Sequence, residues 1–121
     1  MASVNIVNVT SILPFTINGS VTTSSVDIID VPADKLYKVN TIIIANIDGT
    51  NSANVTIGVS TTNGSNYYNL ASTVAVPADS TLVVIDKNSS IYLDETDLLR
   101  VTASANSDLE YTVSGEILDD A

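Results

Sequence analysis

The stretch Ile91–Leu118, IYLDETDLLRVTASANSDLEYTVSGEIL, decides the fold class. Apolar and polar residues alternate through Leu99–Ser104 and again through Leu109–Ile117, and a period of two is typical of half-buried β-strands. Two polar turns, Asp94–Asp97 and Ala105–Asp108, separate the three strands. A slip of one residue would turn the apolar side chains toward solvent, so the alternation also specifies the strand register.

The rest of the sequence repeats this pattern of short strands and turns. Leu36–Ile47 is the most apolar segment, and we expect it to be a central strand because apolar residues cover both of its faces. Asn54–Ser60 and Tyr67–Val76 flank the polar turn Thr62–Asn66 and predict an antiparallel hairpin. Ser3–Thr10 is rich in Val and Ile and is predicted to be extended.

Proline and glycine residues mark edges and corners. Pro14 lacks a backbone N–H, which restricts its segment to an edge or a corner of a sheet. Asn18 and Gly19 together predict a turn. The four residues Val31–Asp34 recur as Val76–Asp79, each time before an apolar strand, and predict a proline-led corner between two sheets.

These elements predict an all-β fold. Strands recur at roughly 8–12-residue spacing without a helical pattern of useful length. We expect one antiparallel β-sandwich of eight or nine strands over residues 1–121, with residues 1–12 as a candidate extended N-terminal arm. The strand number favours a jelly roll over an Ig-like topology.

The charge of the chain limits its partners. Its 14 acidic and four basic side chains give a formal net charge of −10. Such a surface repels nucleic-acid phosphates and anionic lipids, so we expect neither a nucleic acid nor a membrane as partner. Solubility and adaptation to salt both explain the acidity, and composition does not separate them.

Catalytic chemistry has few residues to draw on. The sequence contains no His and no Cys, which excludes triads and metal sites that use either. Carboxylates are abundant, but they fall mainly in turns and at outward strand positions, whereas an acid catalyst needs apolar burial. We therefore expect no enzymatic activity and no cofactor.

One acidic turn is a weak candidate for calcium. Asp94, Glu95 and Asp97 offer hard oxygen ligands within four residues. Their spacing is not that of an EF-hand, and a solvated acidic turn explains the same residues. We therefore expect no bound metal, and these three residues are the only candidates.

Some residues suit an interface with another protein better than a catalytic site. Tyr67 and Tyr68 could stack on a sugar beside Asn66 and Asn69, but tyrosines pack more commonly at a sandwich rim or a subunit interface. Arg100 would contribute most at a subunit seam. The interface candidates are Val4, Ile6, Tyr67, Tyr68 and Arg100.

Three blocks of the sequence resemble small virion structural proteins of marine tailed phages, particularly cyanophage-like ones. The blocks read IIIANIDGTNSANVTIGV, TVAVPADSTLVVIDKNSSIYL and LDETDLLRVTASANSDLEYTVSGEIL. The resemblance covers most of the chain after its first third. In those proteins a turn like DETD is often EEGD, so the missing glycine indicates a different turn type here.

The resemblance implies a place in a virus particle. We expect a non-enzymatic virion protein that decorates or cements the capsid through contacts with the major capsid protein or other virion proteins. The alternatives are an adaptor in the tail, neck or fibre base, and a carbohydrate-binding module for host-surface glycans. We expect a homo-oligomer, with a trimer favoured, that is made in the host cytoplasm and located in the virion.

Overall fold

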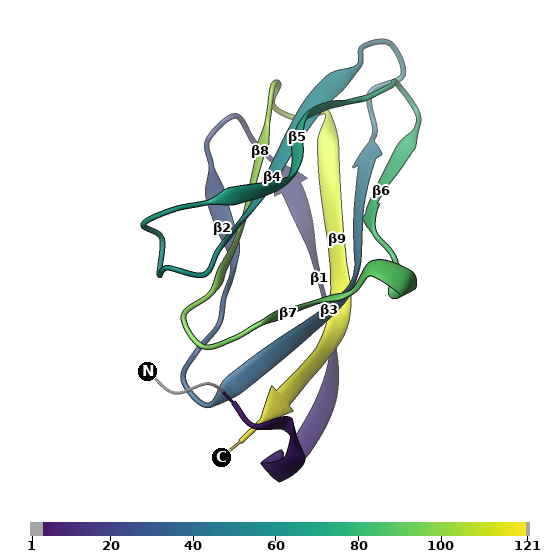
Figure 1. Ribbon diagram of the computed structural model, residues 1–121. Coiled ribbons are helices and arrows are strands. Elements are labelled where there is room, and N and C mark those ends of the chain that lie inside the picture. Colours follow the sequence, from purple (N-terminus) through teal and green to yellow (C-terminus); the bar gives the residue numbers. More distant parts are fainter. Residues whose placement is uncertain (1–3, 121) are drawn as a thin grey trace.

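Two antiparallel β-sheets pack face to face in the computed structural model, which describes residues 4–120 (Figure 1). Short 3-10 turns at Ile6–Asn8 (η1) and Lys87–Ser89 (η2) interrupt an otherwise all-β chain. The strands are β1 (Ser11–Val21), β2 (Val26–Asp30), β3 (Lys35–Asn46), β4 (Ala53–Ser60), β5 (Tyr68–Val76), β6 (Thr81–Ile85), β7 (Ile91–Leu93), β8 (Leu98–Ala103) and β9 (Leu109–Asp119).

Within residues 4–120, strands that follow one another in sequence do not pair, with the exception of β4 and β5. One sheet has the order β1-β9-β3-β6, with β7 pairing to β3 beside β6, and the facing sheet has the order β2-β8-β4-β5. The three strands β7, β8 and β9, which the opening stretch of sequence predicts, therefore alternate between the sheets. The prediction of an antiparallel sandwich of eight or nine strands is confirmed, with nine strands in residues 4–120, while the preference for a jelly roll over an Ig-like topology stays a prediction.

The predicted alternation places apolar side chains between the sheets. Val39, Ile42 and Ile44 of β3 are fully buried, as are Val55 and Ile57 of β4. The total exposed surface is 6373 Å². A compact monomer of this mass exposes about 6,200 Å². The chain thus buries the area expected of a monomer, so a partner is not needed to complete its core.

The repeated four-residue motif forms two equivalent corners. Val31–Asp34 carries the chain from β2 to β3, and Val76–Asp79 carries it from β5 to β6, so each copy crosses from one sheet to the other. Asp34 and Asp79 both adopt left-handed backbone, at φ 64° and 58°. Aspartate tolerates this conformation better than most residues. The prediction of a corner between sheets is confirmed.

The N-terminal predictions are wrong in two places. Ile6–Asn8 forms η1 instead of a strand, capped by the Asn5 side chain, which accepts a hydrogen bond from the Val7 N–H. Asn18 and Gly19 lie inside β1 instead of a turn. The ring of Tyr111 lies 3.1 Å from the position that a Gly19 Cβ would occupy, so the neighbouring strand supplies the packing that glycine lacks.

A second glycine allows two central strands to approach closely. Gly115 of β9 pairs with Val39 of β3, next to a bulge between Val39 and Thr41. A Cβ on Gly115 would overlap the backbone carbonyl of Lys38 and approach the Phe15 ring to 3.1 Å. The bulge and the glycine therefore depend on each other.

No helix within residues 4–120 is long and apolar enough to cross a membrane.

Candidate protein-interaction surface

The sheets diverge along one side of the sandwich and leave apolar side chains partly exposed. Edge strands β5 and β6 spread apart there, and β7 crosses below them (Figure 1). We call this surface the seam and define it by Leu70, Val74, Leu82, Val84 and Ile91. Leu70 is 40% exposed, and the other four are half-buried against the core.

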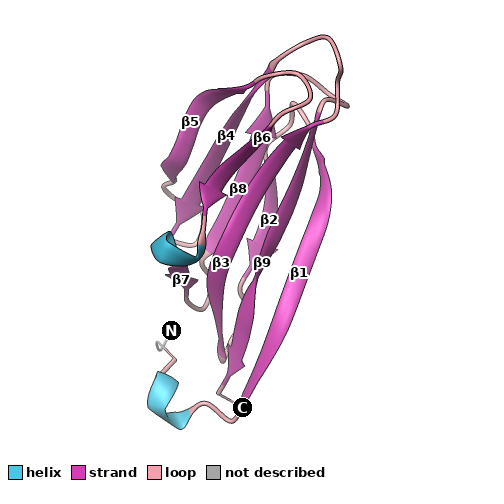
Figure 2. Ribbon diagram, turned by 90° about the vertical axis from the view of Figure 1, so that its right-hand side faces the viewer, coloured by secondary structure: helices cyan, strands magenta, loops and turns pink. Residues whose placement is uncertain are grey.

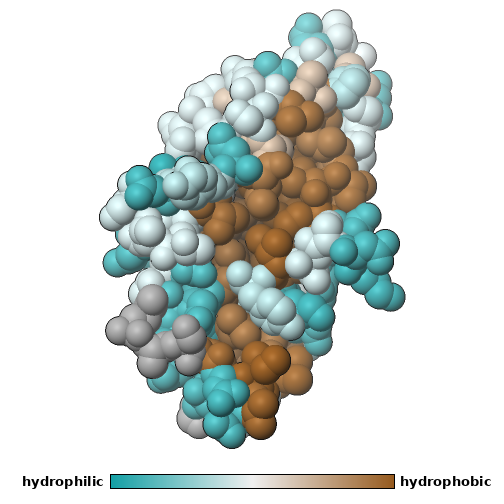
Figure 3. Space-filling model, viewed as in Figure 1, coloured by the Kyte–Doolittle hydropathy of each residue, from teal (hydrophilic) through white to brown (hydrophobic). Residues whose placement is uncertain are grey.

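The seam is part of a continuous hydrophobic band. Figure 3 shows this band running down the face between the two sheets, with hydrophilic residues on both sides. Charged side chains are absent from the five seam residues, although the chain as a whole is strongly acidic. A contiguous apolar patch with a polar rim is typical of a surface that binds another protein.

The N-terminal interface candidates lie near the C-terminal end of the chain. Val4 is half-buried and its N–H donates to Asp94 Oδ1 at 3.3 Å, while Ile6 is 56% exposed. The Thr10 N–H donates to the Asp119 carbonyl at 2.8 Å. This segment thus contacts its own chain, and β1 already includes Ser11 and Ile12. Its role as an arm that clasps a neighbour stays a prediction.

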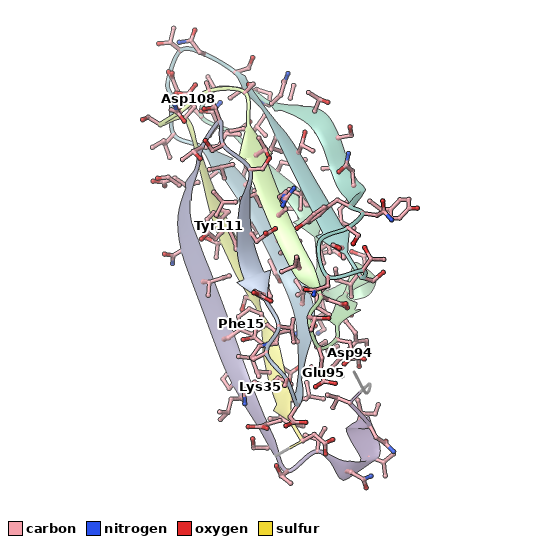
Figure 4. All side chains as sticks on the ribbon, turned by 90° about the vertical axis from the view of Figure 1, so that its left-hand side faces the viewer. Phe15, Lys35, Asp94, Glu95, Asp108 and Tyr111 are labelled. Atoms are coloured by element: carbon pink, nitrogen blue, oxygen red, sulfur yellow. The ribbon has the colours of Figure 1, made fainter. Side chains whose placement is uncertain are left out.

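Backbone N–H groups occupy the carboxylates of the acidic turn. Asp94 Oδ1 accepts from the Glu95 N–H, Glu95 Oε2 from the Asp34 N–H and Asp97 Oδ2 from the Asp94 N–H, all at 2.7–2.8 Å. Glu95 and Asp97 are buried, and burial raises the pKa of Asp97. Glu95 thus ties the turn to Asp34, the residue before β3, while the bonds to Asp94 and Asp97 close the turn itself; Asp94 and Glu95 lie at the lower end of the molecule in Figure 4.

The described part of the chain, residues 4–120, contains no group of three acidic side chains arranged to hold a metal ion. The backbone of the turn is unusual at its third residue. Thr96 stands where the glycine would be, and it adopts left-handed backbone at φ 65°. This conformation is unstrained only for glycine.

Tyr67, Arg100 and Asp27 form a cluster on the β2–β8–β4 sheet. The Arg100 guanidinium lies 3.8 Å from the centroid of the Tyr67 ring, and its Nε lies 3.2 Å from Asp27 Oδ1. The Tyr67 hydroxyl donates to the same Asp27 oxygen at 2.8 Å, and burial together with this bond raises the pKa of Tyr67. Gly58 leaves space for Tyr67, whose Cβ lies 3.5 Å from the position of a Cβ on this glycine.

Tyr68 does not share this environment. It pairs with Val59 in the strand register and is 79% exposed, whereas Tyr67 packs over Gly58 and is covered by Arg100. The structure therefore separates the two tyrosines and does not present their rings together to one sugar.

Acidic loops gather at the other end of the sandwich. Backbone N–H groups of Thr50 and Asn51 lower the pKa of Asp48, whereas burial and the neighbouring Asp48 carboxylate raise the pKa of Asp108. Asp108 lies at the upper end in Figure 4, above Tyr111. Below it is an open polar hollow of about 300 Å³, lined by Asn18, Gly19, Ser20, Glu110, Tyr111 and Thr112.

Sequence reasoning found Arg100 and Tyr67 individually but missed their common partner Asp27. It also missed the seam, because β5, β6 and β7 come together there only through long-range pairing. The segment Thr81–Ile85 could have indicated it. Leu82, Val83 and Val84 are three consecutive apolar residues, whereas a strand with one solvated face alternates apolar and polar residues.

Comparison with known proteins supports the fold but shows no family. No protein-family model matches, and no curated protein matches in sequence. Among solved structures, the chain is similar to a subunit of Bacillus endospore appendages, described as a novel family of disulfide-linked pili. The TM-score is 0.56 at 13% identity, over 92% of this chain and 88% of that one.

Two further structures are more distant. One is a Drosophila NLP core, studied for pentamer formation and histone binding, with a TM-score of 0.49 and 12% identity over 84% of this chain and 96% of that one. The other is a pentameric capsid protein from metagenomic phage sequences, with a TM-score of 0.42 and 18% identity over 87% of this chain and 62% of that one. At these scores neither carries an argument about this chain.

Proposed function

We propose that this protein is a non-enzymatic structural component of a phage virion. In this role it decorates the capsid by binding the major capsid protein or another virion protein. The observation that carries the proposal is the seam, an apolar surface on a protein whose net charge is −10. Exposed apolar area has a cost in solubility, so a contiguous patch indicates contact with a partner.

The resemblance to virion proteins supports the same surface. The block TVAVPADSTLVVIDKNSSIYL corresponds to residues 73–93 and contains Val74, Leu82, Val84 and Ile91. Four of the five seam residues thus come from a segment that resembles virion proteins. The other two blocks, residues 42–59 and 93–118, contain the last part of β3, nearly all of β4 and β9, and all of β8, which belong to the sheets behind the seam.

The proposal is tested by adding the purified protein to virions that lack it and measuring the copies bound by quantitative mass spectrometry. The double variant V84T/I91T makes the seam polar: Thr has nearly the shape of Val at position 84, while at position 91 it also removes the terminal methyl group of Ile. We expect its affinity to fall about tenfold, which corresponds to about 1.4 kcal/mol. V26T is the matched control, because Val26 is exposed on β2, away from the seam.

Three outcomes separate the candidate functions. Hundreds of native copies per particle support capsid decoration, whereas a handful indicates the tail, neck or fibre base. Absence from particles overturns a virion role. The glycan-binding alternative has less support because Arg100 covers the Tyr67 ring. Binding of the wild type on a glycan array, with no binding by the Y68A variant, would support the glycan-binding alternative.

A further inference from the structure

Charged side chains are unevenly distributed along the sequence. Residues 1–26 and residues 49–78 contain none of the 14 acidic and four basic side chains. All of the charge therefore lies in the remaining segments. In a chain with a net charge of −10, these two blocks mark the only long stretches that another copy can approach without direct like-charge repulsion.

The fold carries these two blocks to opposite sides of the molecule. The first block contains β1, which within residues 4–120 pairs with β9 alone and is the edge of its sheet. The second contains β4 and β5, and β5 is the edge of the facing sheet. Figure 2 shows β5 and β1 at opposite sides of the sandwich.

The other edge strands are charged or short, as edges of monomeric proteins usually are. Asp27 and Asp30 lie in β2. β6 has only five residues and lies between Asp79 and Asp86. Short length and charged side chains both prevent unwanted pairing at a sheet edge. β1 and β5 have 11 and nine residues and no charge, so this protection is missing there.

We propose that a second copy of this chain occupies these edges, with β1 of one copy pairing with β5 of the next. The two strands would extend a sheet across the boundary between the copies through backbone hydrogen bonds. Because the two edges differ, the contact is head-to-tail and generates a ring or an open filament. The inference does not depend on a location in the virion.

Charge beyond the edges favours β1–β5 pairing over β1–β1 pairing. β9, next to β1, carries Glu110 and Glu116. Strands lie about 4.8 Å apart, so β1–β1 pairing would bring the two glutamate-bearing strands to about 14 Å. In β1–β5 pairing, the first charged strand across the boundary is β8. By the same spacing, β8 of one copy would lie about 19 Å from β9 of the other. Its charged residue is Arg100, whose sign is opposite to that of the glutamates of β9.

Two local features limit the length of the contact. Pro14 has no N–H to donate, so continuous pairing starts after it in β1. Thr73 has left-handed backbone at φ 49°, which interrupts β5. Each boundary therefore makes few backbone hydrogen bonds, and we expect association that is weak in dilute solution and grows with concentration and with salt, which screens the net charge.

Mixed cross-linking tests the pairing directly, because the native chain contains no cysteine. N18C places a thiol on β1 and S72C places one on β5, and both positions are exposed. With a short bismaleimide, we expect a dimer band when the two differently tagged variants are mixed and none from either alone. A band from N18C alone, or none in the mixture, would overturn the proposal.

Edge lysines provide a second test that leaves the fold intact. Light scattering should show the mass of the wild type rising with concentration, and N18K or S72K should weaken association at least tenfold. S24K is the control, since Ser24 is exposed in the turn before β2. A wild type that stays monomeric at every concentration, or lysine variants that associate normally, refutes β1–β5 pairing without bearing on capsid binding.

Discussion

Replacement of Gly115 by alanine should destabilise the fold more than replacement of Gly19, the other glycine of the β1-β9-β3-β6 sheet. The added Cβ would overlap the backbone carbonyl of Lys38, and a carbonyl in a central strand moves only if β3 and β9 separate locally. Overpacking costs about 3 kcal/mol when a core cannot adjust. Replacing glycine by alanine also raises the free energy of unfolding by about 0.5–1 kcal/mol, because alanine restricts the unfolded chain.

The net expectation for G115A is a loss of about 2 kcal/mol of unfolding free energy, or a fall in Tm of about 8 °C for a domain of this size. Urea and thermal unfolding under dilute, monomeric conditions measure both. G49A is the matched control, because its Cβ would lie 3.6 Å from the Asp79 carboxylate, an ordinary contact. If G115A unfolds within about 0.5 kcal/mol of the wild type, the close approach of these strands is wrong.

Three further predictions concern single sites. T73G should raise the unfolding free energy by about 0.5 kcal/mol, measured by urea unfolding, because relief of a β-branched residue in left-handed backbone, worth about 1–2 kcal/mol, outweighs the roughly 0.5–1 kcal/mol cost of a freer unfolded chain; a loss would contradict this. Y67F should cost about 1 kcal/mol through the lost bond to Asp27, and an unchanged Tm would contradict it. Burial raises the pKa of Asp97, so its ionisation opposes folding, and the contribution of this residue to stability should fall as pH rises from about 4 through that pKa. The stability difference between D97N and the wild type should therefore shift in favour of D97N over this range, and a difference that stays constant with pH would refute the assignment.

Local sequence patterns were sufficient to predict the corners and most of the strands after β1. The alternation in Leu109–Ile117 and the repeated Val-Pro-Ala-Asp motif are both patterns that span only a few residues, so the sequence displays them directly. The expected N-terminal strand failed for a local reason, because the Asn5 side chain accepts a hydrogen bond from the Val7 N–H and caps η1. Gly19 was predicted to be in a turn because its role depends on the ring of Tyr111, which is distant in sequence.

The interaction surfaces show this limit more strongly. Arg100 was identified as a residue that needs a partner, but only the pairing of β2 with β8 places Asp27 opposite it. The seam depends on the divergence of β5 from β6, which no local pattern encodes. The uncharged blocks were visible in the sequence, yet their meaning depended on knowing that β1 and β5 are edges.

The most direct test of a structural role in the virion is a cryo-electron microscopy map of the particle at side-chain resolution. The account predicts a sandwich on the capsid surface at many equivalent positions, with Leu70, Val84 and Ile91 packed against a virion protein. A particle without this sandwich, or one in which these three side chains face solvent, would contradict it.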